Sequence, residues 1–330
     1  MDDTFALQYS YYELYLQPTT SPNDVATTTD SSGADTQSAN DADGDAAPLW
    51  TEDSWTGQDE VAARTLIVEN AAKCQLSETL RRRLPTDSQA WDRFYQQHQT
   101  NFFKDRHYLA TAFPNEFATS PNNSDERNRP QKRTLVEIGC GVGNTLLPLL
   151  EHEDTEWTVY GMDLSAVAID LLKQDERFVR AAAASRAWAG VADLVRDGMP
   201  VACQQVADVA TLLFCLSAVH PDHHSQAAAA AVQALKPGGT LVVRDYGRYD
   251  QAELQLARQR AKRLTDHYYV KHDQTKCYYF TKENLRRLFV EEQGLEVLEN
   301  DYIHRQYQNR GDGTIRRRVW VQARFRKGPV

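Results

Sequence analysis

Several features that define whole classes of protein are missing from this sequence. No run of about 18 apolar residues occurs, so no membrane span and no membrane association are predicted. The first residues, MDDTFALQYSYYELYLQ, lack a basic segment and an Arg-rich amphipathic pattern, so neither secretion nor organelle import is indicated. The five cysteines are widely spaced without a C-x-x-C pair, which argues against a disulfide framework and a zinc site: Cys74, Cys140, Cys203, Cys215 and Cys277. We therefore expect a cytoplasmic protein, with the nucleus as the alternative.

Basic residues are absent from the first 60 residues, which contain 13 Asp or Glu and neither Lys nor Arg. The whole chain has 46 acidic and 37 basic side chains, so the remainder holds 33 acidic against 37 basic ones. From Arg258 to the end there are 17 basic and nine acidic residues. An acidic tail thus precedes a body that becomes basic. A basic face is typical of proteins with phosphate-rich partners, although scattered surface arginines are the plainer alternative.

Composition divides the chain into three regions. Residues 18–48 have almost no large apolar side chains, which predicts that the tail 1–60 is largely disordered. Residues 58–83 predict a helix that stops at Pro85, within a helical region that we assign to 61–130.

The third region, 131–330, alternates apolar β-rich runs with helix-like stretches such as SAVAIDLLKQ and HSQAAAAAVQALK. The β-rich runs are 134–138, 157–162, 206–214 and 240–244. This alternation predicts an α/β fold, a doubly wound and mostly parallel sheet. Two further β-patterned runs flank QNRGDGT and predict a C-terminal antiparallel hairpin that completes the sheet.

A glycine-rich turn follows the first strand in TLVEIGCGVGNT. Gly139, Gly141 and Gly143 are spaced G-x-G-x-G, and Asn144 stands where a dinucleotide motif would have its last glycine. Glu137, two residues before the turn, would repel a pyrophosphate but would suit the α-ammonium of S-adenosylmethionine. The glycines then allow a close approach of the backbone to the ligand.

Two more acids follow the next two strands. Asp163 in VYGMDLS is placed to accept the ribose hydroxyls, as it would for NAD as well. Asp193 in GVADLV is placed to hold the adenine amino group. Three acids at successive strand ends favour S-adenosylmethionine over NAD. Alternatively, these acids only cap helices.

Three longer segments narrow the family: WDRFYQQHQTNFFKDRHYL (91–109), LSAVHPDHH (216–224) and LVVRDYGRYDQAELQL (241–256). Together with LVEIGCGVGN they resemble the tRNA N3-methylcytidine methyltransferases, a branch of the Rossmann-like class I methyltransferases. The resemblance runs from about Trp91 to Phe325. It implies a seven-stranded sheet, S-adenosylmethionine as methyl donor, and methylation of N3 of cytidine 32 in the anticodon loop of certain tRNAs. Serine or threonine tRNAs are expected, with seryl-tRNA synthetase as a possible partner.

The resemblance also implies roles for individual residues. Trp91 and Tyr95 would lie over the cofactor, and Lys104–His107, which includes Arg106, would form a lid within an RNA-binding region 61–130. Leu194 would join Asp193 at the adenine, and Leu213 would lie beside the cofactor. The expected cofactor-binding set is therefore Trp91, Tyr95, His107, Glu137, Gly139, Gly141, Asp163, Asp193, Leu194 and Leu213.

One segment departs from the family pattern. Relatives tend to read Y-V-R-G-D-G-T-R where this chain has YVKHDQTK, so that Lys271, His272, Gln274 and Lys276 replace Arg, Gly, Gly and Arg. An ammonium lacks the bidentate phosphate geometry of a guanidinium. We expect the change to affect tRNA contacts and to leave the cofactor site untouched.

The chemistry needs positioning more than proton transfer. Cytosine N3 is a neutral lone pair, and its methylation creates a positive ring that an acceptor must face. Asp245, at a strand tip, is the candidate acceptor; alternatively it pairs with Arg244 or Arg248 to hold the loop. The predicted catalytic set is Arg106, Arg244, Asp245 and Tyr246.

A loop cytosine must be turned out and stacked, for which Tyr246 and Tyr249 are candidates, as are Phe102 and Phe103. The adjacent Arg316, Arg317 and Arg318 are the expected phosphate-binding cluster, with Arg317 pointing away from its neighbours. The crowded histidines of HPDHH lack a recognisable metal-ligand spacing, so no metal is predicted. A methyltransferase for protein or small molecules and an inactive binding module are the competing interpretations.

Overall fold

The computed structural model describes residues 55–117, 131–152, 155–308 and 315–329. The predicted disordered segment 18–48 and the Gly-Asp-Gly turn at 311–313 lie outside the described residues. Among the helices described, none combines the length and the apolar character needed to cross a membrane.

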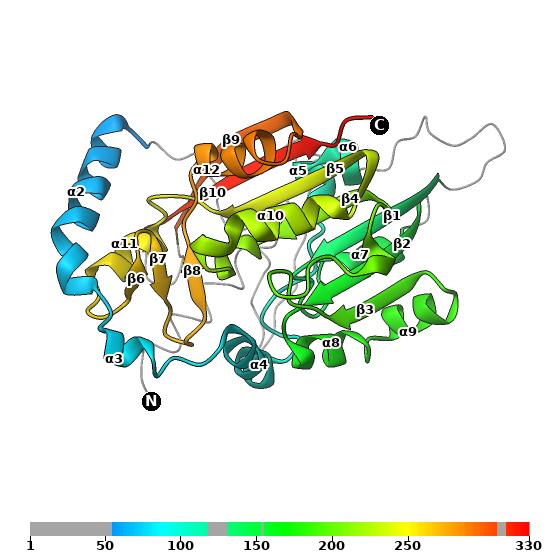
Figure 1. The fold of residues 1–330 in the computed structure, drawn as a ribbon, viewed down its shortest axis with the longest axis horizontal. Helices are drawn as coiled ribbons and strands as arrows, with labels where there is room; N and C mark the ends of the chain where they lie inside the picture. Colours follow the sequence, from blue (N-terminus) through cyan, green and yellow to red (C-terminus); the bar gives the residue numbers. More distant parts are fainter. Residues whose placement is uncertain (1–54, 118–130, 153–154, 309–314, 330) are drawn as a thin grey trace, which may run out of the picture.

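A seven-stranded sheet forms the centre of the molecule, in the order β3-β2-β1-β4-β5-β10-β9 (Figure 1). The first five pair in parallel: β1 (Gln131–Ile138), β2 (Thr155–Asp163), β3 (Ala187–Val191), β4 (Ala207–Leu213) and β5 (Leu235–Tyr246). The last two, β9 (Glu296–Gln308) and β10 (Ile315–Arg326), are antiparallel, as β10 is to β5. The doubly wound sheet and the hairpin strands are therefore confirmed.

The strand expected before Asp193 is β3, with the sequence AWAGV, although the predicted β-rich runs do not include it. It is an edge strand that pairs only with β2, and its Trp188 and Val191 side chains are exposed. A short edge strand with few buried residues carries little of the hydrophobic pattern by which strands are recognised.

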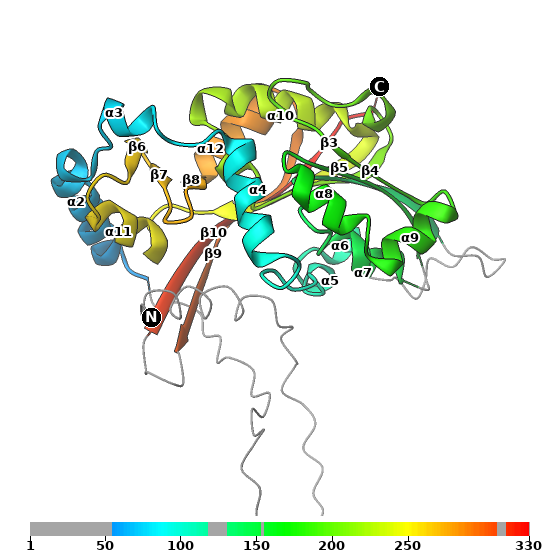
Figure 2. The same ribbon diagram turned by 90° about the horizontal axis from the view of Figure 1, so that it is seen from below.

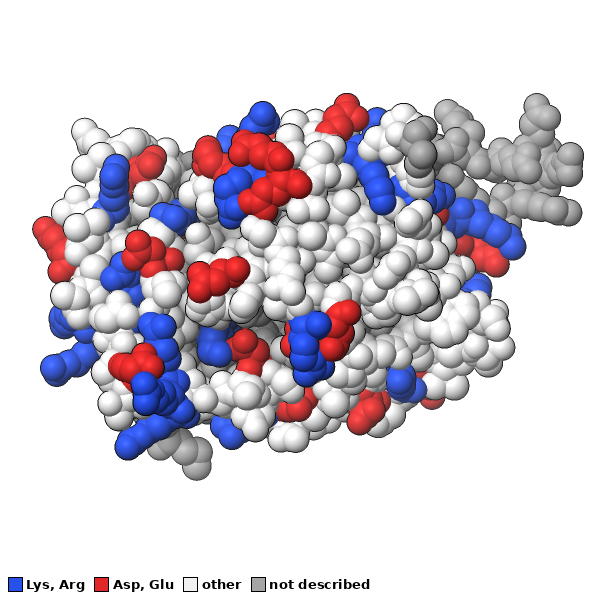
Figure 3. Space-filling model, viewed as in Figure 1, with Lys and Arg blue, Asp and Glu red and all other residues white. Residues whose placement is uncertain are grey.

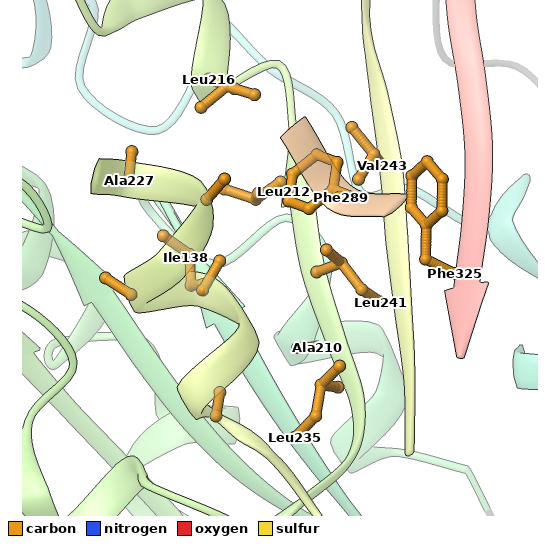
Figure 4. Close-up of a cluster of buried hydrophobic side chains, with 14 of the residues drawn as sticks. Ile138, Ala210, Leu212, Leu216, Ala227, Leu235, Leu241, Val243, Phe289 and Phe325 are labelled. Atoms are coloured by element: carbon orange, nitrogen blue, oxygen red, sulfur yellow. The ribbon is translucent and has the colours of Figure 1, made fainter. Parts of the chain in front are cut away.

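Helices cover both faces of the sheet, because the strands alternate their side chains between two cores. Val136 and Ile138 of β1 face a core shared with α10 (His224–Gln233) and the helical turns α12 (Lys282–Arg286) and η4 (Arg287–Glu291). Figure 4 shows Ala227 of α10 beside Ile138, with Phe289 and Phe325 near Val243. Leu135 faces the other core, which is covered by α7 (Leu146–Leu150), α8 (Ala166–Leu172) and α9 (Glu176–Ala183) together with α5 (Leu109–Ala112) and α6 (Pro114–Phe117).

A second, smaller unit packs beside the main sheet. Strands β6 (Arg263–Thr265), β7 (Tyr268–Val270) and β8 (Lys276–Tyr278) form an antiparallel sheet. It packs with α2 (Gly57–Cys74) and α11 (Gln251–Arg258) through a core that includes Ile67, Leu256 and Tyr279. This unit brings residues 57–74 together with residues 251–278.

The single helix predicted for residues 58–83 is wrong. The chain leaves the helix after Cys74 because Gln75 forms a bridge with Arg263, and the Leu76 N–H donates to the Arg263 carbonyl at 2.8 Å. The Ser77 hydroxyl then caps α3 (Glu78–Arg81). A tertiary strand contact thus interrupts a helical pattern.

Helix α4 (Asp87–His98) lies between the two units, with α8 on one side and β8 on the other (Figures 1 and 2). Thr86 and Gln89 form a capping box at its start. Its buried side chains are Ala90 and, four and five residues later, Phe94 and Tyr95, which lie on one side of the helix. The predicted 61–130 region is therefore divided by packing: α2 joins the small unit, α5 and α6 join the main sheet, and α4 spans both.

Candidate active site

A cavity of about 680 Å³ lies at the carboxyl ends of β1, β2, β4 and β5. This is the edge of an open α/β sheet where ligands bind. Of the predicted residues, ten line it: Trp91, Tyr95, Arg106, Gly139, Gly141, Asp163, Asp193, Leu194, Leu213 and Tyr246. Four do not: His107, Glu137, Arg244 and Asp245.

The glycine turn approaches the cavity with its bare backbone. Gly139 and Gly141 have φ values of 72° and 54°, in the left-handed region that favours glycine. A Cβ on Gly141 would lie 2.5 Å from the hydroxyl of Tyr95, and one on Gly139 would collide with the Cys215 side chain. The turn therefore has no room for side chains at either position.

Asp163 and Asp193 both hold turns and face the cavity. Asp163 accepts hydrogen bonds from the Gly141 N–H at 2.8 Å and the Ser165 N–H at 2.9 Å. Asp193 accepts from the Val195 and Arg196 N–H groups at 3.0 and 3.1 Å. Because an ionised carboxylate has about four acceptor positions, this capping leaves capacity for a ligand. Their capping role is therefore compatible with the predicted ligand contacts at both acids.

Glu137 lies just behind the cavity wall, with a side chain that is only 1% exposed. Its Oε1 is 3.4 Å from the Arg106 guanidinium, whereas its Oε2 is buried without a hydrogen-bond partner among the described residues. Burial raises the pKa of Glu137 to about 7, against the opposing effect of Arg106. An unpaired buried acceptor beside a glycine cradle fits a ligand that brings an ammonium group.

Arg106 ties the ends of β1 and β4 together. Besides Glu137, its guanidinium donates to the Thr145 hydroxyl at 2.9 Å and to the Leu213 carbonyl at 3.5 Å. Its own N–H donates to the Asn144 carbonyl at 2.7 Å. The neighbouring His107 side chain is exposed and lies outside the cavity lining. Within this segment, Arg106 is thus the residue positioned at the cavity.

Asp245 and Arg244 lie on opposite sides of the end of β5. Asp245 is fully buried and accepts from the Ser217 and Tyr246 N–H groups, each at 2.9 Å. Burial raises its pKa to about 6, and no ion pair with Arg244 or Arg248 is present among the described contacts. Since Ser217 and Tyr246 line the cavity, Asp245 sits directly beneath its wall.

Arg244 is directed away from the cavity, into the core around α5. Its guanidinium bonds to Gln322 and lies 4.8 Å from the ring centre of Tyr108 and 5.7 Å from that of Trp320. Desolvation lowers the pKa of this guanidinium. The structure thus places Arg244 in a supporting position rather than beside a ligand.

The prediction that Arg316, Arg317 and Arg318 form a phosphate-binding cluster is wrong. Arg316 and Arg318 are buried, at 6% and 2% exposure, and the Arg318 guanidinium pairs with the buried Asp250 at 2.6 Å. Only Arg317 is half-exposed, and it lies 3.7 Å from Asp59. Two of the three cations are therefore buried within the fold and are not presented to solvent.

The aromatic residues predicted to stack a turned-out base lie in different places. Tyr246 lines the cavity and packs against Phe214, with ring centres 5.1 Å apart. Tyr249 instead stacks on Trp55 at 6.2 Å and is not part of the lining. Phe102 and Phe103 line the cavity while packing on Phe94 and on each other.

The expectation that the departing segment leaves the cofactor site untouched is wrong. Lys271 and Lys276 line the same cavity as Asp163. The Lys271 ammonium lies 5.6 Å from the ring centre of Trp91.

Sequence reasoning also missed two residues of the site, Ser217 and Thr145. Ser217 lies in the LSAVHPDHH segment, which offered a signal. The role of Thr145 is visible only in its hydrogen bond with Arg106.

Comparison with known proteins gives one family model and a set of similar chains. A methyltransferase-domain model matches residues 83–300. The tRNA N(3)-methylcytidine methyltransferase Mettl2 of Drosophila melanogaster is 36% identical over 281 residues, covering 84% of this chain and 83% of that one. The human tRNA N(3)-cytidine methyltransferase METTL6 is 36% identical over 275 residues, covering 81% and 92%. A SAM-dependent methyltransferase structure from Anabaena variabilis shares the fold, with a TM-score of 0.50, 15% identity, and coverage of 73% and 94%.

Proposed function

The chain belongs to the tRNA N3-methylcytidine methyltransferases, and on that premise we propose that it methylates N3 of cytidine 32 in the anticodon loop of certain tRNAs. S-adenosylmethionine is the methyl donor. We propose serine or threonine tRNAs as substrates, seryl-tRNA synthetase as a partner and the cytoplasm as the site of action. The main support for this proposal is the sequence similarity to the Drosophila melanogaster methyltransferase, which covers 84% of this chain.

The residues at the cavity fit the cofactor. The glycine turn offers a backbone cradle, and the unpaired Oε2 of Glu137 matches the ammonium of the methionine part. Asp163 has acceptor capacity for the ribose hydroxyls, and Asp193 with Leu194 suits the adenine. When bound, S-adenosylmethionine supplies an electrophilic methyl group on a positive sulfur.

The remaining residues suit a neutral nucleophile. Cytosine N3 carries no proton to remove, so no general base is needed, and orientation of the base is the main requirement. Tyr246 offers a ring at the cavity for stacking a turned-out base. Asp245, buried beneath Tyr246 and Ser217, places a negative charge where the methylated ring becomes positive. A fixed charge in a water-poor site costs little reorganisation during the reaction.

Arg106 and Arg244 act indirectly in this proposal. Arg106 fixes the strand ends that carry Glu137 and Leu213. Arg244 fixes β5 against β10 through Gln322, which holds the adjacent Asp245 in place. We therefore assign both arginines to positioning.

Phosphate binding falls to a different set of cations from the one first expected. Figure 3 shows Lys and Arg side chains gathered at the lower left, in the region of α3. The exposed cations at the end of α2, just after α3 and at the end of α11 are Lys73, Arg82, Arg83, Arg258 and Arg260. Lys73 and Arg260 line one shallow hollow of this surface. Such a surface suits an RNA backbone and predicts binding that weakens with salt.

The proposal is tested by incubating the protein with labelled S-adenosylmethionine and tRNA, and digesting the product to nucleosides. We expect label in 3-methylcytidine from serine or threonine tRNA, and none from a transcript in which cytidine 32 is uridine. Adding seryl-tRNA synthetase tests the partner. Label confined to protein or to a small molecule would contradict the RNA substrate.

A further inference from the structure

Helix α4 is attached to the cofactor-binding edge of the main sheet by apolar packing of Phe94 and Tyr95 and by the side chain of Asp92. Asp92 accepts a hydrogen bond from the Ser165 hydroxyl at 2.6 Å and from the Val167 N–H at 3.3 Å, both at the start of α8. The Ser165 N–H in turn donates to Asp163. One side of α4 is therefore linked directly to the strand end that carries the ribose-binding acid.

The other side of α4 is held by the small unit, through residues 271–276, which are the loop between β7 and β8 with the first residue of β8 (Figure 2). Three contacts join them. The Lys271 ammonium lies 5.6 Å from the Trp91 ring centre, and the Arg93 guanidinium donates to the Gln274 side-chain oxygen at 3.4 Å. The Lys276 ammonium pairs with the Asp87 carboxylate at 2.5 Å.

These contacts involve three of the four positions at which the chain departs from the family pattern. The fourth, His272, is exposed in the same loop. Gln274 has a φ of 68°, a conformation that glycine adopts more readily. The backbone thus keeps a glycine-type turn while the glutamine side chain reaches Arg93 on α4.

The position of α4 decides the shape of the cofactor cavity. Trp91 and Tyr95 both line that cavity, and the Tyr95 hydroxyl lies against Gly141 of the glycine turn. A 12-residue helix has little stability of its own, so its place is set by its tertiary contacts. Contacts at Asp87, Trp91 and Arg93 therefore fix the aromatic wall of the cavity.

We propose that the loop 271–276 is a clasp on α4, and that Lys271, Gln274 and Lys276 are positioning residues for S-adenosylmethionine. The clasp closes the cofactor cavity from the small unit, while Asp92 anchors α4 to the main sheet. This inference rests on the cofactor cavity and is independent of the proposed tRNA substrate.

The test is calorimetric binding of S-adenosylhomocysteine to the full chain without RNA. We expect Lys271→Met to weaken binding about tenfold, because a cation–π contact on the cofactor wall is lost. Lys271→Arg retains a cation over Trp91 and should restore most of the affinity. The matched control is His272→Ala, which should bind as the unaltered protein does.

A second test measures whether the effects of replacing Lys276 and Asp87 on S-adenosylhomocysteine affinity are additive. Lys276→Met and Asp87→Asn should each weaken binding, and the double variant should be no weaker than the poorer single one, because both remove the same pair. Gln274→Ala provides an exposed change at which folding is not at risk. The melting temperature of ligand-free Gln274→Ala should match that of His272→Ala.

The inference is overturned if Lys271→Met and Gln274→Ala bind S-adenosylhomocysteine as tightly as the control. Binding of a tRNA anticodon stem-loop, measured separately, identifies the alternative. Loss of stem-loop affinity with unchanged S-adenosylhomocysteine affinity would overturn the clasp and assign the loop to RNA. Absence of tRNA methylation by the unaltered protein would leave the calorimetric result intact, so the two proposals fail separately.

Discussion

The two halves of the cavity wall are built differently. The half at the ends of β1, β2 and β3 consists of short loops that directly follow their strands, with Gly139, Asp163 and Asp193 at the tips. The half at β4 and β5 includes Ser217 and Tyr246, and it is completed by Lys271 and Lys276 of the small unit, which depend on contacts with distant segments. The first half is local in sequence, and the second is assembled by tertiary structure.

The same difference separates the charges of the two halves. Asp163 and Asp193 on the first half keep their side chains at the cavity, and Glu137 lies just behind its wall, as expected of a site for a positively charged ligand. Two cations that were expected to face a ligand, Arg244 at the cavity and Arg318 at the RNA phosphates, are instead buried with specific partners. The number of charged residues in a segment therefore does not show which of them face a ligand.

The largest expected effect is a loss of folding stability when the buried Arg318 is replaced, compared with replacement of its half-exposed neighbour Arg317. Arg318→Ala should lower the free energy of unfolding by about 3–5 kcal/mol, because it leaves the Asp250 carboxylate buried and unpaired. Arg317→Ala should cost less than about 1 kcal/mol, because its contact with Asp59 is half-exposed. Urea unfolding measures both, and equal losses would remove the distinction between structural and surface cations.

A second change addresses the local half. Asp163→Ala should weaken S-adenosylhomocysteine binding by about 100-fold, because two charge-assisted hydrogen bonds to the turns and the proposed ribose contacts are lost. Binding of the anticodon stem-loop should be unchanged, since Asp163 belongs to the cofactor side. Calorimetry and a gel-shift titration give the two affinities, and a parallel loss of both would contradict the assignment.

A third change addresses the assembled half. Asp245→Asn keeps the size of the side chain and removes its charge beneath the cavity, so turnover should fall by about 10- to 100-fold. Affinity for S-adenosylhomocysteine should persist. Single-turnover methylation of tRNA separates the chemical step from binding; full turnover in the variant would exclude an electrostatic role for Asp245.

The smallest effect is a pH dependence of cofactor binding. Burial raises the pKa of Glu137 to about 7, so its carboxylate is anionic above that pH and neutral below it. A neutral side chain no longer attracts an ammonium, and affinity for S-adenosylhomocysteine should therefore fall as the pH drops below about 7, by at most about tenfold per pH unit. Glu137→Gln should flatten this part of the profile, leaving any contribution from Asp163, whose pKa burial also raises.

The folding stability of the protein without cofactor depends on pH in the opposite direction to its cofactor affinity. The folded state holds a proton on Glu137 more tightly than the unfolded chain does, because its pKa is raised from 4.5 to about 7. Its contribution to stability is therefore lost as the pH rises from about 4.5 to about 7. Thermal melts of the unaltered protein and Glu137→Gln across this range provide the check.

The sequence by itself determined the alternating architecture, the glycine turn and the acids at successive strand ends. These follow from local rules, since the carboxyl ends of parallel strands meet at one edge of the sheet. Only the tertiary structure decided that helix 58–83 is interrupted, that Arg318 is buried on Asp250, 68 residues away, and that Lys276 reaches Asp87 across 189 residues. Burial and pairing of a charge depend on the partner that the fold supplies, and no pattern of neighbouring residues encodes that partner.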